Sequence, residues 1–357
     1  MYYHLHRELP SHGVETTGIV VGRSIPDVKT VHAPAVGTAF LGSRLRGVRQ
    51  AAVTHLSDGT TDAVASHFAL YAFPVLDVLR DRPFITHFHG PWAAESAAND
   101  AGQAAVEHVK ALIERAVYRR ADRCIVLSEA FGQVLVTQYG VPSERVRCVP
   151  GGVDVDAFAV EGTSADARRR LSWPQDRPIV LAVRRLVARM GLEQLIDAIA
   201  TVRQQVPDVL VFIAGKGPLQ DTLQEGIDTL GLQSHVRLLG FVPEADLPYA
   251  YRAATMTIVP TVRLEGFGLI TLESMAAGTP PLVTPIGGLP EAVSSLAPEL
   301  VLDGATTKAI AEGLVEALQG RRPLPSAAAC EDHVRAHHDW PVIARRVATV
   351  YREVLPV

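Results

Sequence analysis

The sequence predicts an α/β fold of two domains, each built on a parallel sheet with helices packed against it. Short apolar runs that read as buried strands alternate with helical stretches along nearly the whole chain, as is typical of parallel sheets. The length of 357 residues exceeds what one compact core usually holds. A polar stretch rich in Ala and Arg, residues 161–177, separates two halves that show the same alternation. These observations place the boundary near residue 165.

The first domain is expected over residues 1–165. It begins with a helix at residues 2–10, and later helices include 106–119 and 131–139. Its predicted strands are residues 17–21, 63–66, 84–88, 124–127 and 146–149.

The second domain is expected over residues 166–339, with a helix after each strand. Its predicted strands lie near residues 179–183, 209–214, 236–239, 256–259 and 282–284. A helical segment at about 340–357 closes the chain.

Composition excludes several classes of protein. The net charge of −4 carries no basic bias, which argues against a nucleic-acid partner. Three widely spaced cysteines indicate neither a disulfide framework nor a zinc site; Cys124 and Cys148 lie in apolar runs and are expected to be buried. No apolar run approaches the ~18–20 residues that span a bilayer. A cytoplasmic location fits, with peripheral contact to the inner face of the membrane left open.

Two carboxylates stand eight residues apart around a glycine-rich turn. Glu265 precedes Gly266-Phe267-Gly268, and Glu273 lies on the helix that starts near Leu269. An apolar strand runs just before this turn, and ligands of open α/β sheets bind where the strands end. A helix start offers N–H groups to a phosphate, and carboxylates accept hydrogen bonds from sugar hydroxyls. A solvated surface loop is the alternative for this motif taken alone.

Further motifs precede and follow this pair along the chain. They are Pro150-Gly-Gly-Val-Asp154, Ala182-Val-Arg-Arg185 with Arg189-Met-Gly191, Ala214-Gly-Lys-Gly-Pro218 and Ile286-Gly-Gly288. In this order, the motifs resemble the retaining glycosyltransferases of family 4. The resemblance implies the GT-B fold, two Rossmann-like domains with parallel sheets that face each other across a cleft. It also implies that a hexosyl unit passes from a nucleotide-diphosphate sugar, most often UDP-linked, to an acceptor hydroxyl.

The resemblance assigns the donor to the second domain. Glu273 is expected to bind the ribose. Glu265 should face the donor sugar together with the N–H groups of Gly266, Phe267, Gly268 and Leu269. Gly215 and Gly217 should border the base. No cofactor and no metal is expected.

Two cations should grip the diphosphate, because the leaving nucleotide gains negative charge. Arg185 is expected to supply one, and its neighbour Arg184 to point away as a surface charge. The family's Lys, five residues after Arg185, is replaced by Met190. We therefore expect Arg189 to supply the second cation and Met190 to fill an apolar gap.

The first domain should bind the acceptor, which could be a sugar, a lipid-linked glycan or a small molecule. His89 precedes Gly90 at the end of a strand, where the family places a His beside the reaction centre. His87 lies two residues earlier on the same face. An ordinary strand-end histidine is the alternative for His89 and the favoured interpretation for His87.

Three questions stay open from the sequence. The family's first strand is missing before the helix at residues 2–10, so the native chain is expected to extend upstream of Met1. A catalytically inactive nucleotide-sugar-binding or partner subunit, or a GT-B sugar-nucleotide epimerase, remains an alternative function. Residues 106–123 carry both apolar and basic side chains; a helix docked on its own sheet is favoured over a membrane-surface helix.

Overall fold

The computed structural model describes residues 1–21, 30–32, 40–57, 59–99 and 104–355. The chain forms two compact units. Unit 1 combines Met1–Pro150 with Trp340–Val357, and unit 2 comprises Gly151–Asp339. The polar stretch at residues 161–177, where we expected the boundary, therefore belongs to unit 2. The reason is that the Nε atom of Arg168 donates to the carbonyl of Ala253 at 2.8 Å, which ties this stretch to unit 2.

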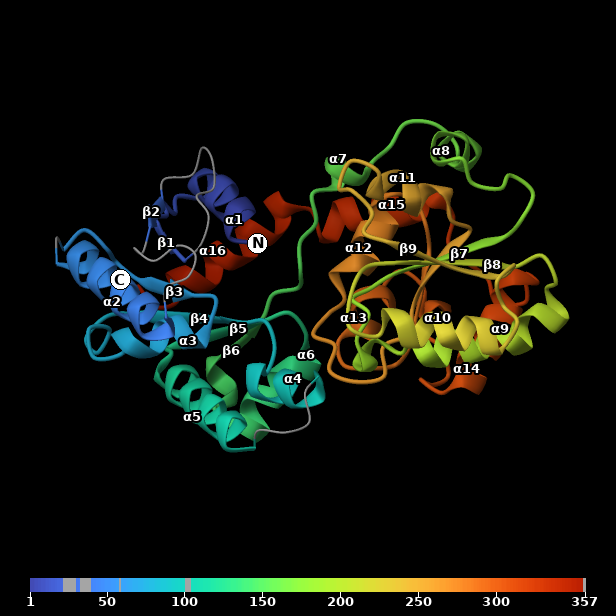
Figure 1. Ribbon diagram of the computed structural model, residues 1–357. Coiled ribbons are helices and arrows are strands. Elements are labelled where there is room, and N and C mark those ends of the chain that lie inside the picture. The colour runs from blue at the N-terminus through green and yellow to red at the C-terminus, as the bar shows by residue number, and fades with distance from the viewer. Residues whose placement is uncertain (22–29, 33–39, 58, 100–103, 356–357) are drawn as a thin grey trace. The chain divides into compact units, whose positions relative to one another are not determined.

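Unit 1 contains a four-stranded parallel sheet in the order β3-β4-β5-β6, and a separate parallel pair, β1 and β2 (Figure 1). The strands are β1 Gly18–Val20, β2 Thr30–His32, β3 Val64–Ser66, β4 Phe84–Phe88, β5 Arg123–Val126 and β6 Val146–Cys148. Strand β2 was not predicted from the sequence. The α-helices are α1 Tyr2–Glu8, α2 Leu41–Leu56, α3 Ala69–Ala72, α4 Trp92–Asn99, α5 Ala104–Arg120, α6 Glu129–Val134 and α16 Trp340–Arg352. The shorter turns are the 3-10 helices Leu9–His12, Phe73–Val75 and Ser143–Arg145 and the π-helix Leu135–Tyr139.

Successive side chains of β4 point to opposite faces of the four-stranded sheet in unit 1, and both faces are buried. Phe84 and Phe88 enter a core with α2, α3 and α5. Ile85 points the other way and packs with α1 and α16. The last helix of the chain thus completes the core of unit 1.

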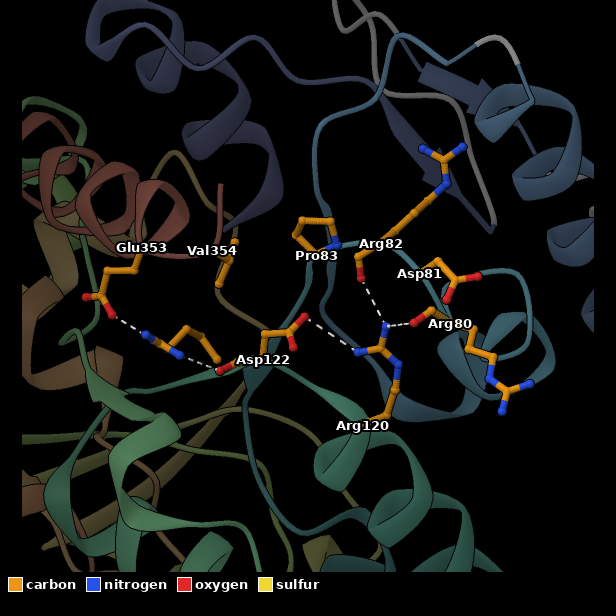
Figure 2. Close-up of a pocket in the computed structure, with 9 residues that line it drawn as sticks. Arg80, Asp81, Arg82, Pro83, Arg120, Asp122, Glu353 and Val354 are labelled. Carbon is orange, nitrogen blue, oxygen red and sulfur yellow. Dashed lines mark hydrogen bonds and ion pairs between the residues drawn. The ribbon is translucent and has the colours of Figure 1, made fainter. Parts of the chain in front are cut away.

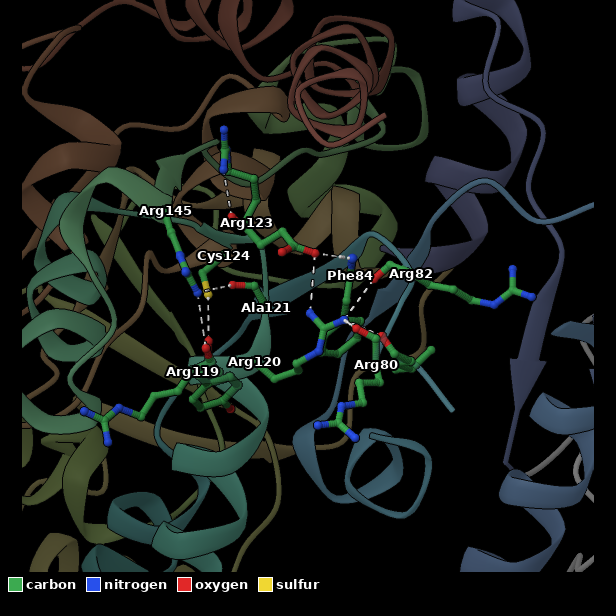
Figure 3. Close-up of polar contacts among 12 residues, drawn as sticks. Arg80, Arg82, Phe84, Arg119, Arg120, Ala121, Arg123, Cys124 and Arg145 are labelled. Carbon is green, nitrogen blue, oxygen red and sulfur yellow. Dashed lines mark hydrogen bonds and ion pairs between the residues drawn. The ribbon is translucent and has the colours of Figure 1, made fainter. Parts of the chain in front are cut away.

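Arginine side chains link the end of α5 to the segments that precede β4 and β6 (Figure 3). The Nη1 atom of Arg145 donates to the carbonyls of Arg119 and Ala121, both at 3.3 Å. Arg120 reaches back to the carbonyls of Leu79, Arg80 and Arg82. Arg145 thus satisfies carbonyls at the end of α5 that lack intrahelical partners.

Two expectations about unit 1 are wrong. Cys148 is exposed, because β6 is an edge strand of the four-stranded sheet, whereas Cys124 on β5 is buried. The apolar residues of α5 are not all docked on the sheet: Val106, Val109 and Leu112 are 44%, 55% and 52% exposed. Only its last turns, with Val117 and Tyr118, enter the core.

Unit 2 contains a five-stranded parallel sheet in the order β11-β10-β7-β8-β9. Its strands are β7 Ile179–Val183, β8 Leu210–Ala214, β9 Val236–Gly240, β10 Met256–Val259 and β11 Pro281–Val283. Its longer helices are α8 Ser164–Leu171, α9 Leu192–Gln205, α10 Gln220–Thr229, α11 Leu247–Ala253, α12 Leu269–Ala276, α14 Thr307–Leu318 and α15 Ala327–His337. The shorter ones are α7 Val155–Phe158, α13 Leu289–Val293 and the 3-10 turns Ala188–Met190 and Pro298–Leu300. Helices α9, α10 and α14 lie on one side of the sheet, and α8, α11 and α15 on the other (Figure 1).

Candidate active site

The paired glutamates of unit 2 lie where β10 ends and α12 begins. The turn between them needs glycine: Gly268 has φ +79°, and a Cβ there would come within 2.4 Å of the Leu289 side chain. A second loop, after β11, holds the turn in place. The N–H of Gly288 donates to the carbonyl of Glu265 at 3.0 Å, and a Cβ on Gly287 would lie 2.0 Å from that oxygen. The backbone around Glu265 is therefore fixed by loop-to-loop packing.

The position of Arg184 differs from our expectation that this residue is a surface charge. Its side chain is buried at the carboxyl end of β7 and ion-pairs with the Oε2 atom of Glu265. The same guanidinium donates to the hydroxyl of Thr261, which itself donates to Glu265 at 3.2 Å. Burying a charge requires such partners. Arg184, rather than its exposed neighbour Arg185, is the cation that contacts Glu265.

Glu273 has a different environment from Glu265. Its Oε2 atom accepts a hydrogen bond from the hydroxyl of Tyr251 at 2.8 Å. Burial raises the pKa of Glu273, and the hydrogen bond from Tyr251 partly opposes this. The site thus holds one carboxylate paired with a cation and one held by a neutral hydroxyl.

Gly215 and Gly217 are required by the protein's own backbone. A Cβ on Gly215, whose φ is +142°, would lie 1.8 Å from the carbonyl oxygen of Arg184. A Cβ on Gly217 would lie 2.3 Å from that of Leu186. The loop after β8 therefore packs directly against the loop after β7, and this contact accounts for both glycines without a ligand.

Arg189 and Met190 are both buried beneath the loop that carries Glu265. The Nη1 atom of Arg189 donates to the carbonyl of Leu264 at 2.5 Å, and its carbonyl accepts from the N–H of Val262 at 3.0 Å. Leu264 has a positive φ of 51°, which is uncommon for a residue with a side chain. Arg189 thus supports this bend, whatever else it binds.

At the start of α12, one side chain is buried and another is exposed. Phe267 is buried, and its ring centroid lies 5.7 Å from that of His338. Leu269 is exposed. The backbone of Gly266, Phe267, Gly268 and Leu269 lies at the sheet edge where a helix start favours an anion.

Unit 1 places three histidines and a tyrosine together. His87 is on β4, His89 follows it, and His67 follows the neighbouring strand β3. The Nδ1 atom of His67 lies 3.1 Å from Nε2 of His89, and Nε2 of His87 lies 2.9 Å from the hydroxyl of Tyr351. Burial lowers the pKa of His87 well below its ordinary value. His67 was not identified from the sequence, because only strand pairing brings it to His89.

A cavity of about 440 Å³ lies elsewhere in unit 1, near the starts of β4 and β5 (Figure 2). Arg120 and Arg123 line it but already bind protein oxygens: Arg120 ion-pairs with Asp122 at 3.5 Å, and Arg123 with Glu353 at 2.7 Å. Figure 2 shows the guanidinium groups of Arg80 and Arg82 directed away from that of Arg120. This cavity contains none of the predicted site residues.

Within the described part of the chain, no group of three or more His, Cys, Asp or Glu side chains is arranged to hold a metal ion. None of the helices described is long and apolar enough to cross a membrane.

Comparisons with known proteins agree with this architecture. The model of glycosyl transferases group 1 matches residues 163–336, and that of glycosyltransferase family 4 matches residues 1–157. D-inositol 3-phosphate glycosyltransferase of Mycolicibacterium smegmatis is 34% identical over 82% of this chain and 67% of its own length. A GDP-mannose-dependent phosphatidylinositol monomannoside mannosyltransferase of Mycobacterium tuberculosis is 30% identical over 59% of this chain and 57% of its own.

Solved structures share the fold at lower identity. Sucrose-phosphate synthase from Thermosynechococcus elongatus superimposes with a TM-score of 0.81 at 22% identity, covering 99% of this chain and 92% of its own. Anabaena HepE in complex with UDP gives 0.74 at 19% identity, covering 91% and 86%. The two units, each built on a parallel sheet, and the likeness to these solved structures show that the chain has the GT-B fold of glycosyltransferases. The chain belongs to glycosyltransferase family 4.

Proposed function

We propose that the protein transfers a hexosyl unit, with retention at the anomeric carbon, from a UDP-linked sugar to an acceptor hydroxyl. Unit 2 binds the donor and unit 1 binds the acceptor. The observation that carries the proposal is the pair of glutamates with opposite environments: Glu265 bound to Arg184, and Glu273 held by Tyr251. A sugar nucleotide needs both a cation for its phosphates and acceptors for its hydroxyls.

Glu273 binds the ribose in this proposal. Tyr251 occupies only Oε2, so the Oε1 atom is the acceptor for ribose hydroxyls. The hydrogen bond from Tyr251 also fixes the orientation of the carboxylate before the donor arrives, which lowers the entropic cost of binding.

Arg184 and Glu265 act at the opposite end of the donor. Glu265, held in place by Arg184, accepts hydrogen bonds from the hydroxyls of the hexose, and the N–H groups of Gly266, Phe267, Gly268 and Leu269 donate to the donor. Arg184 is buried close by and stabilises charge as it develops on the leaving diphosphate. Arg185 contributes from the surface, and Arg189 supplies the second cation in place of the family's Lys. Gly215 and Gly217 border the base.

Two donor nucleotides occur among the similar proteins. HepE is similar to this chain and was solved with UDP and with UDP-glucose, whereas the mannosyltransferase relatives depend on GDP-mannose. We favour UDP and treat GDP as the competing outcome. His89 in unit 1 contacts the acceptor hydroxyl, and the leaving phosphate accepts the proton of that hydroxyl.

A screen of UDP- and GDP-hexoses for hydrolysis without acceptor tests the function. Release of the nucleoside diphosphate, with the hexose appearing first as the anomer of the donor, supports a retaining transferase. Formation of an epimer identifies a sugar-nucleotide epimerase. Binding of a nucleotide sugar without turnover identifies an inactive binding or partner subunit, and both latter outcomes contradict the proposal.

We also propose that unit 1 contacts an anionic membrane surface through α5. Its exposed apolar residues Val106, Val109 and Leu112 recur at helical spacing. The remaining exposed positions of the described helix hold His108, Arg115 and Arg119 among alanines, and no carboxylate. Apolar side chains flanked by cations are typical of helices that lie on anionic bilayers.

The inward face of α5 supports this interpretation. Glu114 is buried and accepts from the N–H groups of Trp92 and Ala93 at 2.8 and 3.1 Å, so its charge faces the protein. Sedimentation with vesicles of phosphatidylglycerol and phosphatidylcholine tests it. Val109→Asp with Leu112→Asp should abolish co-sedimentation, and Val53→Asp, at an exposed valine of α2, should not. Equal binding by all variants, or a solution dimer that the double variant breaks, would contradict membrane contact.

A further inference from the structure

Strand pairing in unit 1 brings three imidazoles together. Strands β3 and β4 are parallel neighbours with Ser66 opposite Thr86, so the next residues, His67 and His87, lie side by side. Their ring centroids are 4.2 Å apart and their planes differ by 21°. The ring centroid of His89, two residues further on, lies 5.4 Å from that of His67, with the planes 11° apart, and 6.3 Å from that of His87. His67 is therefore the ring that lies nearest to both of the others.

The contact between His67 and His89 couples the protonation of two ring nitrogens. Their facing nitrogens, Nδ1 of His67 and Nε2 of His89, are 3.1 Å apart. Two lone pairs or two N–H groups at this distance would repel, so one nitrogen carries the hydrogen and the other accepts it. Burial and the neighbouring His89 lower the pKa of His67 to about 3, so His67 is neutral at ordinary pH. With either proton placement, the Nε2 atom of His89 is engaged by His67.

The His87 ring, which packs against His67, is held by Tyr351. The Nε2 atom of His87 lies 2.9 Å from the hydroxyl of Tyr351 on α16, and Tyr351 crosses the His87 ring edge-to-face at 81°. His87 is buried. The ring that supports His67 is thus held from a different element of unit 1, so His67 has little freedom to turn away from His89.

We propose that His67 is a positioning residue for His89: by binding Nε2, it sets the tautomer of His89 and leaves Nδ1 as the only ring nitrogen that meets the acceptor. This rests on the proposed function, because it assumes that His89 serves the acceptor hydroxyl. His89 is exposed, unlike His87, so its ring needs such a restraint to hold one orientation. A functional group held by a second side chain loses less entropy when substrate binds.

Two substitutions at His67 separate positioning from packing. His67→Asn keeps a hydrogen-bonding atom near the place of Nδ1, whereas His67→Phe keeps the stacked ring and removes the hydrogen bond. Two-bond 15N–1H spectra of the imidazoles, assigned with His89→Ala, report the tautomer without any substrate. Wild type and His67→Asn should show His89 as one neutral tautomer, and His67→Phe should show a mixture. A tautomer of His89 unchanged in His67→Phe overturns the proposal.

Kinetics provide the second test, with water as the acceptor and the UDP- or GDP-hexose that the screen identifies as donor. His67→Phe should lower kcat about tenfold, the scale of one hydrogen bond, with donor KM within about twofold, and His67→Asn should restore most of kcat. His55→Phe, a half-buried histidine on α2, should match wild type. Wild-type kcat in His67→Phe overturns the proposal. If wild type turns over no donor, the proposed function fails, and the NMR result alone decides whether His67 sets the tautomer.

Discussion

Removing the cation from the buried pair in unit 2 should destabilise that unit strongly. The side chains of Arg184 and Glu265 are only 6% and 13% exposed. Arg184→Met leaves the buried carboxylate of Glu265 without its cation, with the Thr261 hydroxyl as its remaining side-chain partner among the described residues. Breaking a buried ion pair in this way costs about 3–5 kcal/mol of unfolding free energy. Because Glu265 keeps some contact with solvent, we expect about 3 kcal/mol.

The matched control is Arg185→Met, which removes the exposed neighbouring charge and should change the unfolding free energy by less than about 0.5 kcal/mol. For a unit of this size, 3 kcal/mol lowers Tm by roughly 6–12 °C. Trp173 is in unit 2, whereas Trp92 and Trp340 are in unit 1. Urea unfolding followed by fluorescence in a Trp92→Phe, Trp340→Phe background therefore reports on unit 2.

Glu265→Gln completes a double-mutant cycle. The double variant should be less destabilised than the sum of the single variants by about 1–3 kcal/mol, because no uncompensated charge remains. Glu265→Gln should also lower turnover while UDP affinity stays near that of wild type, since its partner is the sugar. Additive stabilities, or equal effects of Arg184→Met and Arg185→Met, would refute the ion pair.

Three further predictions concern other residues of the two units. Burial raises the pKa of Glu273, so its carboxyl keeps a proton to a higher pH in the folded chain than in the unfolded chain. Above the ordinary pKa, the buried charged form therefore lowers the stability of the fold. Glu273→Gln should raise Tm at pH 8 but not at pH 4, and a lower Tm at pH 8 would contradict this. His89→Ala should reduce transfer with little change in Tm, and the assignment is wrong if His87→Ala impairs turnover more in a folded protein. Arg189→Ala should weaken binding of UDP more than of uridine, and Met190→Lys should partly rescue it; because Arg189 also holds the carbonyl of Leu264, an equal loss for both ligands would indicate a structural role alone.

The sequence predicted the sheets well where strands are buried. Strands β4, β7 and β10 begin and end at the expected residues, because each is a short apolar run enclosed on both sides. Cys148 was misjudged since an apolar run does not show that its strand lies at a sheet edge. Exposure of α5 was missed for a similar reason: its apolar spacing fits a sheet-facing helix, and only the packing shows that the stripe with Val109 faces outward.

The candidate site was harder to predict than the fold. Spacing located Glu265 and Glu273, but it did not show which of two adjacent arginines turns inward after β7. That direction is set by the loop after β8, where Gly215 and Gly217 approach the backbone of the β7 loop. His67 and Tyr351 came together with His87 only through strand register and the return of α16, contacts that no local pattern contains.

Calorimetric titration of UDP tests the central claim that unit 2 binds a nucleoside diphosphate and that Glu273 holds its ribose. Wild type should bind one UDP, and Glu273→Ala should weaken binding by ~1.5–3 kcal/mol, the range for hydrogen bonds to a charged group. Glu193→Ala, at an exposed glutamate on α9, should bind as wild type does. The account is contradicted if wild type binds neither UDP nor GDP, or if Glu273→Ala binds as tightly as Glu193→Ala.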